Sequence, residues 1–375
     1  MHDDELTQLR QRIADIDEEI FERIAERNRI AEKISQYKHA HQEPQRNFAH
    51  EKLVLERAQK AAEKHGLDAS IYTPIALTLI RAAITIEERY TMARSARGEQ
   101  RPVLIIGGRG KMGGWMLDFL RSQGFRVVSA DPAGPVPNVE SHTDWRSLDL
   151  DRFDAIIVAP PLRQTNQTLL ELAARKPKGI VFDVGSLKTP LREGIAALHA
   201  AGVRVTSIHP MFGPDVELLS GQHIIFIDCG DAEALAYAHE LFAPTTAVQV
   251  DMSLDEHDQL IAVVLGLSHA VNIAFFDALA QSGQSAPKLA KMSSTTFDSQ
   301  LRVAEPVSNE NPWLYYDIQA LNEFGMTSLE ALETSVQRIK SAVENKDADA
   351  FVAIMTEGRE YLRGRTPNED LLKSQ

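Results

Sequence analysis

The chain has 375 residues, a formal net charge of −13 and one cysteine, Cys229. This length predicts two or three domains, and the acidic balance argues against a protein that binds nucleic acid or an anionic membrane through bulk charge. A single cysteine excludes an internal disulfide and a cysteine-rich metal site, so we expect a reducing, cytoplasmic location and no metal. The acidic N-terminus is unlike a signal peptide, and the lack of an apolar run of about 18 residues predicts no membrane span.

Residues 5–39 carry apolar side chains at steps of three and four, which is the pattern of one amphipathic helix. At about 1.5 Å per residue this helix would be roughly 50 Å long. A helix of that length cannot bury its apolar stripe within a small domain, so we expect partner helices from a second copy of the chain, in a homodimer. The stripe consists of Leu6, Leu9, Ile13, Ile16, Ile20, Ile24, Ala31 and Ile34.

Two further helices are expected, over 48–65 and from near Asp68 to about Arg94, so that residues 1–94 form an all-helical domain. Residues 95–101 are polar, contain Gly and Pro, and are typical of a linker.

Residues 102–251 alternate short apolar runs with helix-like stretches, which predicts a doubly wound parallel α/β sheet. The expected strands are 103–108, 125–131, 155–160, 179–184 and 203–210, extended by 224–229 and 247–251, with helices near 112–123, 165–176 and 189–201. Residues 252–375 are again helical and contain no expected strand. The helices there are expected over 254–281, 286–303, 312–345 and 347–362.

The first expected strand runs directly into a glycine-rich motif, Gly108-Arg109-Gly110-Lys111-Met112-Gly113. GxGxxG between a strand and a helix is the dinucleotide-binding fingerprint, in which Gly108 would allow a tight turn, Gly110 the approach of a pyrophosphate and Gly113 close helix packing. Asp131 ends the next strand, where an acid binds the adenosine ribose, so NAD is favoured over NADP. Arg109 and Lys111 could offset that acid and admit NADP, and a glycine turn in an unrelated α/β fold is the alternative.

His209 lies in the stretch SIHPMFGPD, immediately before Pro210. Proline pushes the preceding residue into an extended backbone, so His209 should be held at a strand end, at the edge where open α/β sheets bind ligands. A histidine there suits proton transfer in a dehydrogenase. Ser186, in DVGSLK, follows the preceding strand at the same edge, although it could equally be a helix N-cap.

The motifs GGRGKMGG, DVGSLK, IHPMFGPD, EHD (256–258) and GLSH (266–269) resemble those of the prephenate dehydrogenases of tyrosine biosynthesis. The resemblance implies that His209 accepts the proton of the prephenate C4 hydroxyl, that Ser186 orients that hydroxyl, and that His269 lies near the substrate. His257 would also contact the substrate, unless it is only a contact at a helix N-terminus. The arginine that binds a substrate carboxylate in this family falls on Pro306 here, and Arg302, one turn earlier, could replace it.

The N-terminal helices resemble AroQ-type chorismate mutases. That resemblance implies that Arg10 reaches across the dimer, that Arg27 binds a carboxylate of chorismate and that Lys38 binds its ether oxygen. It also implies that Glu51 binds the C4 hydroxyl of chorismate and that Glu87 lies near the ether oxygen. Each of these residues taken singly could be part of a solvated helix face. Three positions depart from the family pattern. His50 replaces a substrate-binding arginine, Asn47 replaces an aspartate and Ala83 replaces a serine.

The fused order is that of bifunctional chorismate mutase/prephenate dehydrogenases, which implies conversion of chorismate to prephenate and then, with NAD, to 4-hydroxyphenylpyruvate. Three alternatives remain open at this point. The same reactions could act on the 4-amino-4-deoxy analogues, the helical domain could be a degenerate allosteric or dimerisation module, or the chain could be a generic β-hydroxyacid dehydrogenase with a helical tail.

Overall fold

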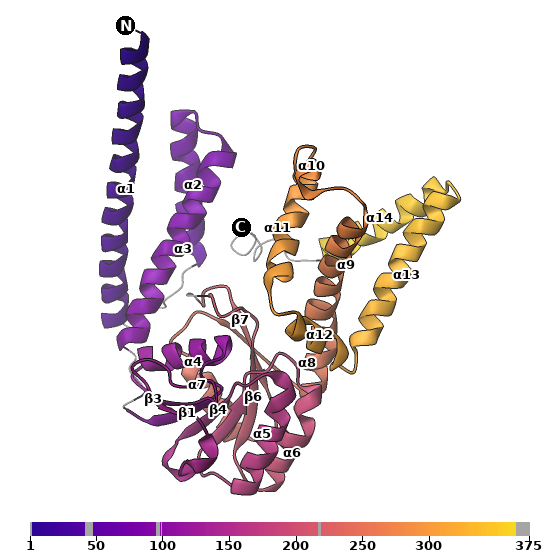
Figure 1. Cartoon of the computed structure of the whole chain (residues 1–375). Helices are drawn as coiled ribbons and strands as arrows, with labels where there is room; N and C mark the ends of the chain where they lie inside the picture. The colour runs from indigo at the N-terminus through magenta and orange to yellow at the C-terminus, as the bar shows by residue number, and fades with distance from the viewer. Residues whose placement is uncertain (1, 42–47, 95–97, 99, 217–218, 365–375) are drawn as a thin grey trace.

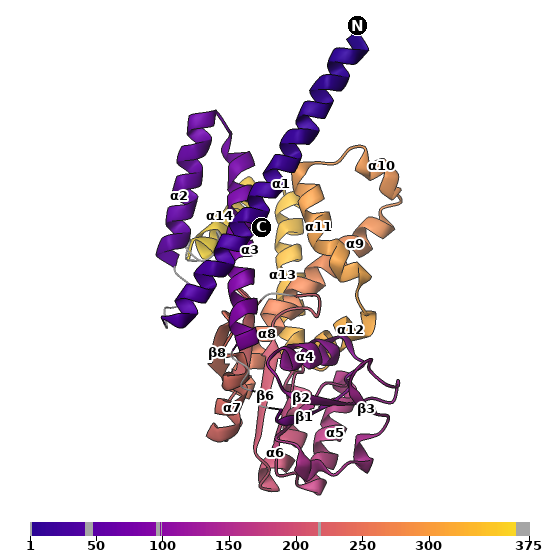
Figure 2. The same cartoon turned by 90° about the vertical axis from the view of Figure 1, so that its left-hand side faces the viewer.

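The computed structural model describes residues 2–41, 48–94, 98, 100–216 and 219–364, with only the backbone described for 2–3, 48–51 and 93. A central sheet domain carries two groups of helices, one from each end of the chain (Figure 1). Both groups rise from the same side of the sheet domain, as the view in Figure 2 also shows.

The N-terminal group consists of α1 (His2–Ala40), α2 (Phe48–His65) and α3 (Ala69–Arg94), and α3 packs against both of the others. The three expected helices are therefore confirmed. The N-terminal end of α1 extends beyond its neighbours (Figure 1), and the apolar stripe in the first half of α1 faces solvent in the single chain. The exposed side chains there include Leu6, Leu9, Ile13, Ile16, Ile20 and Phe21.

The sheet has eight strands in the order β3-β2-β1-β4-β5-β6-β7-β8. The strands are β1 (Pro102–Ile106), β2 (Arg126–Ala130), β3 (Glu140–His142), β4 (Ala155–Val158), β5 (Ile180–Asp183), β6 (Val205–Pro210), β7 (His223–Ile227) and β8 (Val248–Met252). All neighbours are parallel except β6 and β7, which are antiparallel. The expected doubly wound α/β sheet is therefore confirmed, and β7 and β8 run antiparallel to the other strands. A loop with no helix among its described residues joins β6 to β7, whereas parallel strands need a crossover.

Helices cover both faces of the sheet: α4 (Lys111–Ser122), α5 (Leu162–Arg175), α6 (Arg192–Ala200) and α7 (Ala232–Phe242). Alternate residues of β1 belong to two separate apolar cores, Val103 and Ile105 to one, Leu104 and Ile106 to the other. Burial on both faces explains why the strands read as continuous apolar runs.

The C-terminal group begins with a continuous helical stretch made of α8 (Leu254–Ile261), a π-helix (Ala262–Leu267) and α9 (Ser268–Gln281). The helix expected over 286–303 is instead two, α10 (Ala286–Ala290) and α11 (Thr295–Asn309), because the Ser294 hydroxyl caps a new helix by accepting from the N–H of Phe297. The stretch 312–345 likewise divides into α12 (Pro312–Ala320) and α13 (Gly325–Glu344), followed by α14 (Ala348–Arg363).

Two helical stretches, Ala69–Met92 and Leu254–Gln281, have the length and apolar composition of a membrane span, although charged residues interrupt both of them. Helices of soluble proteins also meet this criterion. In this structure α3 contacts α1 and α2, and α9 contacts α11, so both stretches already pack against protein.

Candidate active sites

The glycine-rich loop joins β1 to α4 through backbone contacts that exclude side chains. Gly107, just before the motif, has φ +89°, and its carbonyl accepts from the N–H of Gly110 at 3.0 Å, so Gly108 lies inside this tight turn. A Cβ on Gly108 would lie 2.3 Å from the Ser129 hydroxyl oxygen. A Cβ on Gly113 would lie 2.1 Å from the Gly107 carbonyl oxygen, so the close packing expected of Gly113 is confirmed.

The first turn of α4 is open to an anion, because Gly110 is its N-cap and provides no side-chain cap. Asp131, at the end of β2, accepts from the backbone N–H groups of Arg109 at 3.0 Å and Ala133 at 2.8 Å. A carboxylate fixed beside the glycine loop fits the ribose of a dinucleotide whose pyrophosphate lies on the helix N-terminus. Lys111 Nζ, in the same turn, forms an ion pair at 3.0 Å with Glu310, which follows α11.

His209 is the penultimate residue of β6 and is paired with Ile225 of β7. The extended backbone expected before Pro210 is confirmed, and the side chain is 5% exposed. The strand is the sixth of the chain, because the short β3 was not anticipated, and β6 lies beside β5, from which the Ser186 loop departs.

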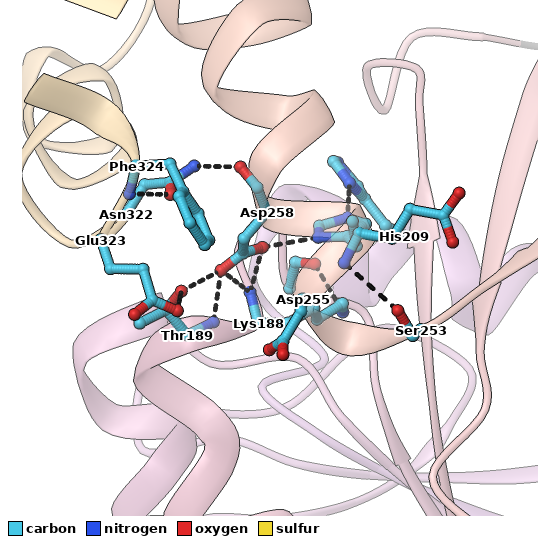
Figure 3. A network of polar contacts seen from close by, with 12 residues as sticks. Lys188, Thr189, His209, Ser253, Asp255, Asp258, Asn322, Glu323 and Phe324 are labelled. Atoms are coloured by element: carbon cyan, nitrogen blue, oxygen red, sulfur yellow. Dashed lines mark hydrogen bonds and ion pairs between the residues drawn. The ribbon is translucent and has the colours of Figure 1, made fainter. Parts of the chain in front are cut away.

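A second histidine contacts His209 from the C-terminal group. His209 Nδ1 lies 2.9 Å from His257 Nε2, and His257 Nδ1 lies 2.6 Å from Asp258 Oδ1. His257 and Asp258 are both fully buried at the start of α8. The result is a buried line of three titratable side chains that joins the sheet edge to the C-terminal helices (Figure 3).

Backbone donors hold Asp258 in place. Its carboxylate accepts from the N–H of Lys188 at 2.9 and 3.1 Å, and from both the N–H and the hydroxyl of Thr189. Asn322 Nδ2 donates to the backbone carbonyl of Asp258 at 2.9 Å. Figure 3 shows Asp258 between the Lys188–Thr189 turn on one side and His209 on the other.

Burial sets the protonation of this line. It lowers the pKa of His209 well below 6.5, and the charges of His257 and Lys188 lower it further. Burial also lowers the pKa of His257, although its hydrogen bond to Asp258 opposes this. For Asp258, burial raises the pKa, but the hydrogen bonds from His257, Thr189 and Lys188 outweigh it and leave a net lowering. Both histidines are therefore neutral near pH 7, and Asp258 is a carboxylate.

Lys188, fully buried, fixes the loop that carries Ser186. Its Nζ forms an ion pair with Asp183 at 2.8 Å and donates to the carbonyls of Gly185 at 2.7 Å and Ile208 at 2.9 Å. These contacts join the ends of β5 and β6. Ser186 is half-buried in this loop and is not a helix cap, since the next helical turn begins at Thr189 with Lys188 as its N-cap.

His269 lies one residue into α9, directly after the π-helix, a distortion that is frequent at functional sites. Its ring packs edge-on against Tyr315 of α12 at 4.5 Å, and burial lowers its pKa. Within the described residues its buried Nδ1 has no hydrogen-bond partner. Pro306 and Arg302 are both exposed on α11, where Arg302 donates to the Ser299 hydroxyl at 2.9 Å.

Three of the expected mutase residues lie along the contact between α1 and α3. Lys38 Nζ contacts both carboxylate oxygens of Glu87, at 2.8 and 3.1 Å, and Arg27 donates to the carbonyl of Leu79 at 2.6 Å. Burial lowers the pKa of Arg27. The buried Asn28 side-chain oxygen has no partner among the described residues. Arg27 and Lys38 are thus two cations on the side of α1 that contacts α3, which suits the binding of a small anion.

Arg10 is exposed on the free half of α1, 17 residues before Arg27, which corresponds to about 26 Å along a helix. It therefore cannot join Arg27 in the same chain. The side chains of His50 and Glu51 lie outside the described residues, as does Asn47 entirely. Ala83 lies on α3, half-buried, one turn before Glu87. Within the described part of the chain, no group of three His, Cys, Asp or Glu could hold a metal.

Comparison with known families separates the chain into three matched segments. Residues 9–88 match chorismate mutase type II, 140–251 match the nucleotide-binding domain of prephenate dehydrogenase, and 253–357 match its dimerization domain. The chain belongs to the family of bifunctional chorismate mutase/prephenate dehydrogenases. Such enzymes rearrange chorismate to prephenate and oxidise prephenate, with loss of CO2, to 4-hydroxyphenylpyruvate in tyrosine biosynthesis.

Similar proteins include the T-protein of Enterobacter agglomerans, 27% identical over 354 residues, which are 93% of this chain and 91% of that protein. The 4-amino-4-deoxyprephenate dehydrogenase of Streptomyces pristinaespiralis is 25% identical over 276 residues, 69% of this chain and 90% of its own length. A solved structure of A. aeolicus prephenate dehydrogenase, in complex with hydroxyphenyl propionate and NAD+, is also similar. The match covers 70% of this chain and 98% of that chain, with a TM-score of 0.56 and 23% sequence identity, and it supports the fold.

Sequence reasoning missed two residues that the structure brings to the dehydrogenase site, Asp258 and Lys188, and it missed the buried contacts of Glu88 with Leu219 and Thr246 in the sheet domain. The first two lie inside motifs already quoted, EHD and DVGSLK, so their place in the chain was visible although their contacts were not. Glu88 follows the expected mutase residue Glu87, and nothing in the sequence separates it from an exposed helical glutamate.

Proposed function

We propose that His209 is the proton acceptor of the dehydrogenase reaction and that Ser186 helps to orient the substrate hydroxyl. The observation that carries the assignment is the position of His209 at the sheet edge, neutral, buried and with Nδ1 occupied by His257. Nε2 is then the ring nitrogen left for a substrate. His269, beside Tyr315, is proposed to line the pocket that receives the rest of the ring.

The glycine loop, the N-terminus of α4 and Asp131 are proposed to hold NAD. When bound, its nicotinamide accepts the hydride from C4 of prephenate. As that hydride leaves, the C4 oxygen becomes strongly acidic, so a weakly basic imidazole is enough to take its proton. The proton returns to the same oxygen when loss of the ring carboxylate as CO2 makes the ring a phenol, so His209 is regenerated without outside base.

For the mutase reaction we propose that Arg27 and Lys38 bind chorismate in the groove between α1 and α3. Cations placed there stabilise the negative charge that develops on the ether oxygen. Glu87 would work best protonated, since its carboxylate otherwise competes for Lys38. Arg10 would complete the site of a partner subunit, and Glu51 and His50 would contribute from the start of α2.

The assembly that follows is a cytoplasmic homodimer, with the exposed stripe of α1 and the C-terminal helices as its interfaces. We propose domain limits of 1–94, 102–251 and 252–375, joined by the linker 95–101. The protein would bind the small molecules chorismate and prephenate, and it would bind neither nucleic acid nor a membrane.

The test measures NADH formation from prephenate and chorismate loss in the full chain. His209→Asn should abolish NADH formation and leave chorismate loss intact, while Arg27→Ala should do the reverse. An exposed histidine, in His65→Asn, serves as the matched control. Full dehydrogenase turnover by His209→Asn would overturn the assignment of the base, and unchanged mutase turnover by Arg27→Ala would overturn the role of Arg27. Chorismate loss no faster than the uncatalysed reaction in the wild type would instead favour a non-catalytic helical domain.

Pro306 favours a second candidate, in which both reactions act on the 4-amino-4-deoxy analogues. The family's carboxylate-binding arginine is absent at this position, and one relative carries the name of a 4-amino-4-deoxyprephenate dehydrogenase. Arg302 is the residue that would bind the carboxylate if the usual substrates are used. Parallel assays with prephenate and its amino analogue decide between them, because a strong preference for prephenate excludes this candidate. Arg302→Ala should then raise KM for prephenate.

A further inference from the structure

The hydrogen bonds of Asp258 and His257 join two domains, and they also determine which ring nitrogens of His257 and His209 carry protons. The carboxylate of Asp258 can only accept hydrogen bonds, so the nitrogen facing it, His257 Nδ1, must carry a proton. His257 is neutral, and its Nε2 is then an acceptor. His209 Nδ1, 2.9 Å away, must donate to it, which leaves Nε2 of His209 with a free lone pair.

We propose that Asp258 and His257 are positioning residues that select the tautomer of His209 in which Nε2 is the base. The inference rests on the proposed role of His209. It changes the role expected for His257, whose two ring nitrogens are both engaged within the protein and whose side chain is fully buried, so it does not touch substrate.

The hydrogen-bonded relay Asp258–His257–His209 also stabilises the protonated form of His209. When His209 takes the substrate proton on Nε2, its ring becomes a cation that still donates through Nδ1 to His257. The negative charge of Asp258, one ring further on, stabilises that cation, in the way that an acid supports a catalytic histidine in other enzymes. Lys188 lies near both histidines and opposes a second positive charge, and Asp183, 2.8 Å from its Nζ, compensates it.

The surroundings of Asp258 give a sharp test, because its two oxygens differ. Oδ2 accepts from both the N–H and the hydroxyl of Thr189, while the N–H of Lys188 lies between the two oxygens, 2.9 Å from Oδ1 and 3.1 Å from Oδ2. In Asp258→Asn the amide oxygen must therefore occupy that side, which turns the NH2 group toward His257. His257 Nδ1 becomes an acceptor, its Nε2 a donor, and His209 is forced into the tautomer with a proton on Nε2.

Asp258→Asn should thus lower kcat for prephenate roughly 10²–10⁴-fold, while KM for prephenate changes less than about threefold. Asp255→Asn is the matched control, since it makes the same change at an exposed carboxylate of α8 and should keep kcat within about threefold. The direct readout is the 15N chemical shifts of histidine-labelled full-length protein. They should report Nδ1–H on His209 in the wild type and Nε2–H in Asp258→Asn.

His257 provides a second pair of variants if Asp258→Asn does not fold. In His257→Gln the amide can accept from His209 Nδ1 and donate to Asp258, so kcat should recover much of its wild-type value. His257→Leu can do neither, and should lose kcat at unchanged KM. Equal activity of the Gln and Leu variants, or wild-type 15N shifts with full kcat in Asp258→Asn, would overturn the relay. If instead His209→Asn is fully active, the proposed base itself is wrong, whatever the 15N shifts report.

Discussion

Glu87 and Glu88 are consecutive residues of α3, yet their carboxylates bind different domains. Glu87 forms the ion pair with Lys38 in the mutase groove at 2.8 Å. Glu88 is 2% exposed and accepts from the N–H of Leu219 at 3.2 Å and of Thr246 at 3.0 Å, both in the sheet domain, and from the Thr246 hydroxyl. The last turns of one helix therefore join the mutase groove to the frame of the dehydrogenase.

Glu87→Gln should raise mutase activity at neutral pH. The wild-type carboxylate neutralises Lys38 and repels the charge that develops on the ether oxygen, whereas an amide can donate to it. Because one preorganised donor is worth about 10²–10³ in rate, an increase of roughly tenfold in kcat/KM at pH 7.5 is a modest expectation. A variant slower than wild type at every pH would show that the carboxylate itself is needed.

Glu88→Ala should loosen the junction of the two domains. It leaves buried N–H groups of Leu219 and Thr246 without their acceptor, at a cost of about 1–3 kcal/mol. Calorimetry of the full chain should show a lower Tm, with the melting of the helical domain separating from that of the sheet domain. Glu56→Ala, at an exposed glutamate of α2, is the control. An unchanged, single transition in Glu88→Ala would mean that other contacts hold the junction.

The sequence was sufficient for the elements whose apolar pattern is unambiguous. Strands buried on both faces, such as β1, appear as apolar runs, and the stripe of α1 has helical spacing. The pattern of β3, Glu140–His142, is polar and three residues long, and it was missed. The antiparallel direction of β7 depends on its connection to β6, and the residues of β7 themselves do not indicate that direction.

For the sites, sequence reasoning located single residues but not their pairing. His209 and His257 are 48 residues apart and come from different domains, so only the fold brings them to 2.9 Å. The break between α12 and α13 likewise depends on a tertiary contact of Asn322 with Asp258, which local propensity cannot reveal.

Stability should fall as the pH drops below about 6.5, the ordinary histidine pKa in the unfolded chain. In the folded chain burial lowers the pKa of His209, His257 and His269, so below that pH the unfolded state binds protons that the folded state does not. Each such histidine adds a slope of up to about 1.4 kcal/mol per pH unit, down to its folded pKa. Urea unfolding at pH 7.5 and 5.5 measures the loss. His257→Gln should make the slope shallower and His65→Gln should not; equal slopes would contradict burial as the cause.

Asp131→Ser should shift the cofactor preference. Loss of a charged acceptor for the ribose hydroxyls is expected to lower kcat/KM for NAD by roughly 10–100-fold. The same change removes the repulsion of a 2′-phosphate, so activity with NADP should rise, and the Arg109 side chain would then be able to bind that phosphate. Steady-state kinetics with both cofactors give the ratio, and Asp118→Ser, at an exposed acid on α4, controls for a general loss of negative charge. If Arg109→Ala in the Asp131→Ser background cancels the gain with NADP, Arg109 is the phosphate ligand. A preference for NAD that survives Asp131→Ser would place the selectivity elsewhere in the loop.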